Sequence, residues 1–140
     1  MPDFDLDRFV VAQAQVYSQA LSELKAGRKQ SHWMWFVFPQ LAGLGRSPTA
    51  VYYAIASADE ARAYLAHPML GPRLLECTRA VLAHRGRSAE FIFGAVDAMK
   101  LRSSMTLFEA VAADPAPFAS LLAYFFGTER DSATLSLLDG

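Results

Sequence analysis

The sequence predicts an all-α fold: a compact single domain over residues 1–140, built from about six to eight helices with at most one short pair of strands. Two observations support this class. Apolar residues recur at the 3.6-residue spacing of a helix over several long segments. Serine, aspartate, proline and glycine, which begin or end helices, separate those segments. Hydrophobic residues make up 53% of the chain and charged residues 19%, which supplies enough apolar material for a core.

Helix signals are clear in the first half of the chain. The first helix is expected over residues 6–24, where apolar side chains recur at i, i+3, i+4 and i+7, and Gly27 lies beyond its end. Ser57 and Glu60 have the spacing of a capping box. They predict a helix that ends before Pro68, because the residue preceding a proline disfavours helical backbone.

Further helical segments follow in the second half. The expected helices cover residues 72–86, 88–93, 96–113 and 117–126, and proline, serine or glycine stands at or beside their ends. A short last helix is expected after Asp131, which would cap it. Only residues 33–38 and 51–55 have strand-like composition. A lone pair of short strands is marginally stable, and residues 33–38 fit a short buried helix equally well.

Composition and charge exclude several classes of protein. The net charge of −1 creates no global field that attracts nucleic acid or an anionic membrane, so we expect neither as a partner. The single cysteine, Cys77, cannot form an internal disulfide and suits a reducing compartment. The N-terminus is acidic, unlike a signal peptide, and the longest apolar stretch, residues 33–38, is too short to span a bilayer. We therefore expect a cytoplasmic monomer.

A helical wheel of residues 96–113 places polar side chains on the face that should join the core. Leu101 and Phe108 define this face, and the polar residues in the same sector are Asp97, Lys100 and Ser104. The residues expected to face solvent are Arg102, Thr106 and Glu109. A lysine and an aspartate on an apolar face must pair, reach its edge or line a cavity. Two interpretations stay open: an Asp97–Lys100 pair at the core edge, or a polar pocket.

The aromatic block of residues 29–40 supplies a second set of polar groups. Because Trp and Phe are costly to expose, we expect this block to be largely buried, with its polar rim paired or facing a ligand. The candidate binding residues are Lys29, Ser31, His32, Trp33 and Gln40 from the block and Asp97, Lys100 and Ser104 from the helix. A lysine charge, hydroxyl and imidazole donors and a stacking indole suit a small anionic ligand, such as a nucleotide or its fragment.

These residues specify no reaction class and no catalytic residue, although His32 or Asp97 would serve as an acid or base in an enzyme. The alternative function is a non-catalytic protein-interaction module. It would dock a partner through the aromatic block or through the face of Arg102 and Thr106. The three histidines lack the spacing of metal ligands, so we expect neither a metal nor a cofactor.

Two further features have both a structural and a functional interpretation. Gln13 interrupts the apolar face of the first helix, where it would either bond buried backbone or reach the same pocket. The loop of residues 43–48 contains two glycines and fits a structural turn. Its backbone N–H groups would alternatively cradle a phosphate, although a lone Gly-x-Gly without a preceding strand is a weak signal.

Four segments resemble the signature of a known family, the domain-of-unknown-function family 1810. They are Lys29-Gln-Ser-His-Trp-Met-Trp-Phe-Val-Phe-Pro-Gln40, Gly43-Leu-Gly-Arg-Ser-Pro48, Tyr64-Leu-Ala-His-Pro68 with Leu70-Gly-Pro-Arg73, and Lys100-Leu-Arg-Ser-Ser-Met-Thr-Leu-Phe108. The resemblance covers nearly the whole chain and implies the α-helical fold of a small, mainly bacterial family. Some members carry the label calpastatin. The resemblance brings no established activity, cofactor or catalytic residue.

Overall fold

The computed structural model describes residues 4–84, 86–127 and 129–139, and residues 1–3, 85, 128 and 140 lie outside the described part. Within that part the chain is helical and its only strand-like pairing is a single bridge, so the all-α prediction is confirmed. The helices are α1 (Asp7–Ala26), α2 (Met34–Val37), α3 (Pro48–Tyr52), α4 (Ala58–Ala66), α5 (Leu70–Leu82), α6 (Ala89–Phe93), α7 (Ala95–Val111), α8 (Ala116–Phe126) and α9 (Ser132–Asp139).

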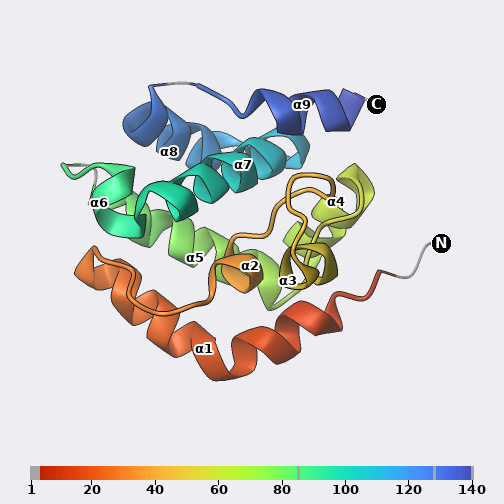
Figure 1. Ribbon diagram of the computed structural model, residues 1–140, viewed down its shortest axis with the longest axis horizontal. Coiled ribbons are helices and arrows are strands. Elements are labelled where there is room, and N and C mark those ends of the chain that lie inside the picture. The colour runs from red at the N-terminus through yellow and green to blue at the C-terminus, as the bar shows by residue number, and fades with distance from the viewer. Residues whose placement is uncertain (1–3, 85, 128, 140) are drawn as a thin grey trace.

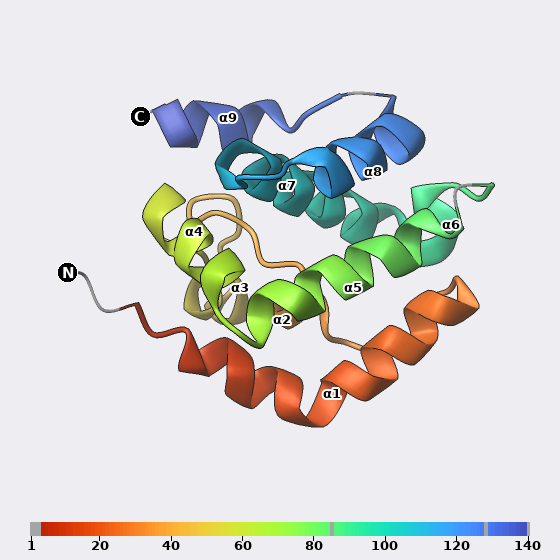
Figure 2. The same cartoon turned by 180° about the vertical axis from the view of Figure 1, so that it is seen from behind.

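The longer helices are stacked in tiers, as Figures 1 and 2 show from opposite sides. Helix α1 forms one outer tier, α5 lies in the middle, and α7, α8 and α9 form the other outer tier. Contacts of α1 with α5 and of α5 with α8 join the tiers, and α7 contacts both α8 and α9 within the outer tier. Helix α4 touches both α5 and α7. The largest fully buried side chains include Phe9, Trp33, Phe38, Tyr64, Phe108 and Phe118. In the described ranges, no helix is long and apolar enough to cross a membrane.

Serine caps and glycine ends define several helices where the sequence indicates them. Ser47, Ser57 and Ser88 precede α3, α4 and α6, and each side chain accepts a hydrogen bond from the backbone N–H three residues on, at 3.0–3.2 Å. Gly27 ends α1 with φ +81°, a left-handed conformation that favours glycine. Local polar chemistry therefore determines these boundaries.

Both segments of strand-like composition overlap a short helix: α2 lies within residues 33–38, and α3 ends inside residues 51–55. These two helices bring the number in the described part to nine, where about six to eight were expected. A remnant of strand pairing is the parallel bridge between Leu41 and Ile55. The Ala42 N–H donates to the Ile55 carbonyl at 2.7 Å, and the Ile55 N–H donates to the Gln40 carbonyl at 2.8 Å. The bridge therefore fixes the backbone around Gln40.

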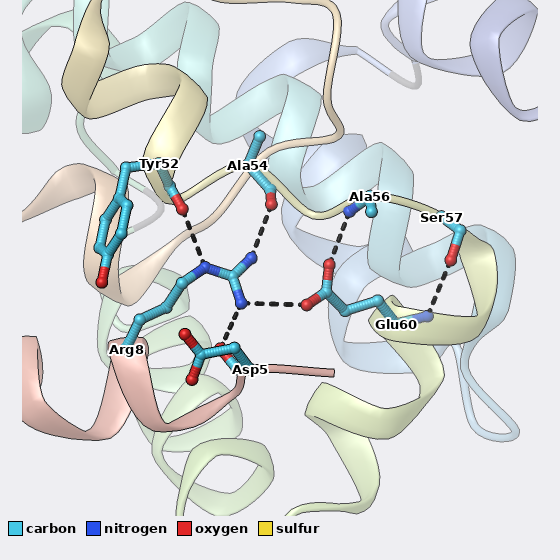
Figure 3. A network of polar contacts seen from close by, with 7 residues as sticks. All are labelled: Asp5, Arg8, Tyr52, Ala54, Ala56, Ser57 and Glu60. Carbon is cyan, nitrogen blue, oxygen red and sulfur yellow. Dashed lines mark hydrogen bonds and ion pairs between the residues drawn. The ribbon is translucent and has the colours of Figure 1, made fainter. Parts of the chain in front are cut away.

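Arg8 and Glu60 join α1 to the segment between α3 and α4 (Figure 3). The Arg8 guanidinium donates to the carbonyls of Tyr52 at 2.9 Å and Ala54 at 2.7 Å, and it pairs with the Glu60 carboxylate at 3.0 Å. The carboxylate also accepts from the Ala56 N–H at 2.6 Å. Both side chains are almost fully enclosed, with 9% and 4% exposed, and burial strengthens such charged hydrogen bonds.

Helix α7 is buried around most of its circumference in its C-terminal half, and not on one face alone. Six consecutive residues, 103–108, are buried. The prediction that Thr106 faces solvent is therefore wrong: Thr106 is fully buried, and its hydroxyl donates to the Arg102 carbonyl at 2.8 Å and accepts from the Asp131 N–H at 2.9 Å. A one-sided wheel fails here because other segments enclose the helix.

The segment of residues 129–131 covers the side of α7 that was expected to be open. Arg102, with 27% of its side chain exposed, pairs with Glu129 at 3.2 Å. Glu109, with 18% exposed, pairs with Arg130. The predicted solvent positions of Arg102 and Glu109 are corrected in the same way as that of Thr106. Residues 129–131 therefore cover part of this face, and a partner that docked here would contact them as well as α7.

Candidate ligand-binding site

Two adjacent clefts open beside the N-terminal half of α7. The first, here called the Gln40 cleft, has a volume of about 310 Å³ and is lined by Gln40, Leu44, Gly45, Val96, Met99 and Ser103 among others. The second, here called the Lys29 cleft, has a volume of about 330 Å³ and is lined by Lys29, His32, Trp33, Phe36, Thr49 and Asp97 among others. Trp35 and Lys100 line both clefts and so stand between them.

Asp97 holds two lysines from distant parts of the chain. Its carboxylate pairs with Lys29 at 2.9 Å and with Lys100 at 3.1 Å. The expected Asp97–Lys100 pair is present, but Lys29 joins it from the loop after α1. Burial opposes ionisation of Asp97, but hydrogen bonds from Lys29 and Lys100 outweigh this effect and lower its pKa. The three side chains therefore form a charged cluster with one positive charge in excess.

The two lysines differ in exposure and in their remaining contacts. Only 7% of the Lys29 side chain is exposed, and its ammonium also donates to the Ser31 carbonyl at 2.6 Å. The Lys100 side chain is 22% exposed, and its ammonium lies 4.1 Å from the centre of the Trp35 ring. A cation over an indole face is attracted to the ring. Lys29 is thus enclosed, whereas Lys100 borders open space.

Trp35 is the indole that both clefts share, although Trp33 was the expected stacking surface. Trp33 is 1% exposed, and its indole N–H donates to the Glu23 carboxylate at 2.9 Å. Its ring lies 5.0 Å from the Lys29 ammonium, so it supports that lysine from the core side. Trp35 is half-buried and is the better placed of the two to contact a ligand.

Glu23, a residue that the sequence did not suggest, organises the loop that carries Lys29. Its buried carboxylate accepts hydrogen bonds from the Gln30 N–H at 2.8 Å, the Ser31 N–H at 3.0 Å and the Ser31 hydroxyl at 2.6 Å. Burial favours the protonated acid, but these bonds and one from Gln19 outweigh it and lower the pKa of Glu23 to about 2. The carboxylate therefore stays charged and holds the loop.

Gln40 brings an unused donor to its cleft. The residue is 8% exposed, and no described residue gives its amide nitrogen, Nε2, a hydrogen-bond partner. Leaving a buried donor unpaired costs about 1–3 kcal/mol. Such a group in the wall of a cleft is a candidate contact for a ligand.

Two candidate residues lie apart from the open space of the clefts. Ser31 donates its hydroxyl to Glu23, so it stabilises the loop. Ser104 is fully buried and lines neither cleft, and its hydroxyl has no partner among the described residues. His32 is exposed at the rim of the Lys29 cleft, on the same cleft as Lys100. The structure thus brings most, but not all, of the candidate set to one place.

Gln13 has a structural role. It is 1% exposed, and its amide donates to the Phe36 carbonyl at 2.6 Å and to the Tyr64 hydroxyl at 3.1 Å, while its oxygen accepts from Arg73 at 3.3 Å. These bonds tie α1 to α2, α4 and α5. Gln13 therefore satisfies buried polar groups, as one of its two interpretations required.

The loop of residues 43–48 packs as a turn against α3. Ser47 uses its side-chain oxygen to cap this helix, and Gly43 has φ +103°. A Cβ atom on Gly45 would come within 2.5 Å of the Ala50 side chain, so this backbone approaches α3 too closely for another residue. No three histidine, cysteine or acidic side chains gather as a metal site in the part of the chain that the structure describes.

Comparison with known proteins identifies the family. A family model described as "Protein of unknown function (DUF1810)" matches residues 3–138. The crystal structure of the conserved hypothetical protein Rv1873 from Mycobacterium tuberculosis is 56% identical in sequence and covers 98% of both chains, with a TM-score of 0.96. No curated protein matches the chain. The chain therefore belongs to the DUF1810 family, whose helical fold it shares.

Proposed function

We propose that this chain binds a small anionic, nucleotide-derived ligand in the Gln40 and Lys29 clefts. The observation that carries this proposal is the position of Lys100, which borders both clefts with its ammonium 4.1 Å from the Trp35 ring centre. Asp97 and Trp35 hold the ammonium in place before any ligand arrives. Preorganisation of this kind reduces the entropy lost on binding.

The charge balance of the cluster favours an anion. Lys29 and Lys100 together carry one positive charge more than Asp97 neutralises. Lys29 is occupied by Asp97 and the Ser31 carbonyl, so we assign it a supporting role. Lys100 retains exposed surface and would donate a charge-assisted hydrogen bond to a phosphate or carboxylate.

The size of the clefts suits a small metabolite. Each volume lies at the lower end of the range for ligand pockets, about 300–1,000 Å³. One cleft would hold a fragment of a nucleotide, such as its base or its phosphate. The two clefts together would hold a whole mononucleotide in contact with Trp35 and Lys100, which line both. Their walls combine apolar side chains with a few polar groups, as ligand pockets generally do.

One observation favours the alternative function, a protein-interaction module. Val96 and Met99, at the mouth of the Gln40 cleft, are 68% and 63% exposed. Exposed apolar side chains beside a cleft also occur where proteins dock. However, most of the aromatic block is buried and residues 129–131 cover the Arg102 side of α7, which leaves less open surface than this function was expected to use.

Substitution of Lys100 tests the proposal. Lys100→Met keeps the length of the side chain, and Asp97 keeps Lys29 as its partner, so we expect little change in melting temperature. The affinity for AMP should fall by at least about tenfold, because a charge-assisted hydrogen bond is worth about 1.5–3 kcal/mol. Isothermal titration calorimetry with AMP and with inorganic phosphate measures the effect.

Lys25→Met is the matched control, because Lys25 is an exposed lysine at the end of α1 that lines neither cleft. This variant should bind AMP as the wild type does. If the wild type binds neither AMP nor phosphate, or if both variants bind them equally well, the proposed function is wrong. A melting temperature that falls in Lys100→Met with unchanged affinity would assign Lys100 a structural role only.

A further inference from the structure

The Gln40 cleft contains a buried polar group that the protein leaves unused. The amide nitrogen of Gln40 has no hydrogen-bond partner among the described residues, and the residue is 8% exposed. Its backbone is held by the hydrogen bond between the Ile55 N–H and the Gln40 carbonyl at 2.8 Å. Fixed backbone therefore holds Gln40 at the wall of the cleft.

Two other polar side chains of this cleft already have partners. Ser103 donates its hydroxyl to the Met99 carbonyl at 3.2 Å. The Asp131 carboxylate accepts from the N–H and the hydroxyl of Thr134, at 3.0 and 2.5 Å, at the start of α9. Among the described side chains that line this cleft, Gln40 is thus the one with a buried donor that has no partner.

Apart from Lys100, the remaining wall of the cleft is apolar and suits a flat ring. Trp35, Leu44, Val96 and Met99 line it, and Gly45 presents backbone without a side chain. Thioether and indole groups pack well against aromatic rings. The Lys29 cleft differs, because two lysines, an aspartate and a histidine line it.

We infer that the Gln40 cleft binds the heteroaromatic ring of the ligand and that Gln40 Nε2 donates to an acceptor on the edge of that ring. This inference rests on the proposed function, in which Lys100 binds the anionic group. A purine base offers ring nitrogens or a carbonyl as acceptors, and glutamine is one of the side chains that read such edges. The ligand class is therefore a purine nucleotide, its base on the Gln40 side of Trp35 and its phosphate at Lys100.

Gln40→Met tests this inference, because methionine has a similar length and no donor. The affinity for AMP should fall on the order of tenfold, the factor expected for one lost hydrogen bond of about 1.4 kcal/mol. The affinity for ribose 5-phosphate, which has no base, should not change. The melting temperature should stay the same or rise, because the change removes an unpaired buried donor. Calorimetric titrations and melting curves provide these measurements.

The outcomes separate this inference from the proposed function. If wild type binds neither AMP nor ribose 5-phosphate, the proposed function itself fails. If Lys100→Met loses both ligands while Gln40→Met binds AMP as wild type does, only the base assignment fails. A Gln40→Met variant that melts several degrees lower with unchanged AMP affinity would show that Gln40 serves stability, which also overturns the inference.

A second measurement on the wild type does not depend on the folding of a variant. In saturation-transfer NMR with AMP, the adenine H2 and H8 protons should receive more saturation than the ribose protons, because the apolar wall would enclose the base. Stronger saturation of the ribose would contradict the placement of the base in the Gln40 cleft.

Discussion

Glu23 shows how one buried carboxylate couples the shape of a loop to pH. Its pKa is lowered from the ordinary 4.5 to about 2, because hydrogen bonds from Ser31 and Gln30 outweigh the effect of burial. A carboxylate with a lowered pKa in the folded state contributes stability above its unfolded pKa. That contribution is lost as the pH falls from about 4.5 towards about 2.

We predict that Glu23→Gln destabilises the protein at pH 7 by about 1.5–3 kcal/mol. The substitution removes charged hydrogen bonds, and it places the NH2 group of the new amide, which can only donate, beside the donors of Gln30 and Ser31. The difference from wild type should shrink as the pH falls from about 4.5 to about 2, where wild-type Glu23 also becomes protonated. Urea denaturation over this pH range measures it. Glu90→Gln, at an exposed position in α6, should change stability by less than about 1 kcal/mol at every pH. A constant difference across the range would contradict this role of Glu23.

Residue-level prediction worked where a side chain acts within its own helix and failed where it acts across the chain. The Asp97–Lys100 pair follows from helical spacing, and the structure contains it. The contacts of Glu23 with Gln30 and Ser31 depend on how the chain turns back after α1, which no periodic pattern records. Trp33 and Trp35 are indistinguishable by composition, and only packing decides that Trp33 is buried while Trp35 lines both clefts.

At the scale of elements, the Arg8–Glu60 pair joins α1 to α4 and to the turn before it (Figure 3). Both charges are buried, so removal of one leaves the other without its counter-charge, at a cost of about 3–5 kcal/mol. Arg8→Met should therefore lower the free energy of unfolding by about this amount. Hydrogen exchange of the amides at residues 54–57 should also become faster, because the carbonyls of Tyr52 and Ala54, at and just before this segment, lose their donor.

Arg62→Met is the control for this substitution. Arg62 pairs with Asp59 one turn away on α4, with 57% and 74% of the two side chains exposed. An exposed pair of this kind contributes about 0.3–0.5 kcal/mol. If the two variants lose equal amounts of stability, burial is not the reason that the Arg8–Glu60 pair contributes more to the free energy of unfolding than an exposed pair does.

The helices themselves were largely predictable, because their caps and breaks are local. Ser57, Ser88 and Gly27 stand at helix ends, as their sequence contexts indicate. The capping box was only half realised: the Ser57 side chain caps α4, but the Glu60 carboxylate binds Arg8 and the Ala56 N–H. Helices α2 and α3 were harder to predict, since aromatic and β-branched residues in a short buried segment fit strand or helix equally well.

At the scale of the whole molecule, the candidate site depends on contacts between distant segments. Lys29 lies in the loop after α1 and Asp97 lies on α7, yet they pair at 2.9 Å. The sequence suggested that these residues converge, because both regions place polar groups beside apolar ones. It could not show that residues 129–131 return across α7 and bury Thr106, because that cover is a tertiary contact.

The molecule also has a second basic surface, which provides a contrast for binding experiments. Phe91 is 53% exposed, and the guanidinium groups of Arg28 and Arg87 lie 5.9 Å and 5.1 Å from its ring centre. An anion attracted by charge alone would bind at this surface as well, because the two guanidinium groups are positively charged. Binding in the Gln40 and Lys29 clefts must therefore be distinguished from it.

The most direct test is a titration of uniformly 15N-labelled protein with AMP, followed by NMR. We expect saturable shifts of the Trp35 indole N–H and of the backbone amides of Gln40 and Lys100, with one common Kd and a smaller shift of the Trp33 indole. Shifts confined to Arg28, Arg87 and Phe91, or no saturable shift, would contradict binding in the clefts.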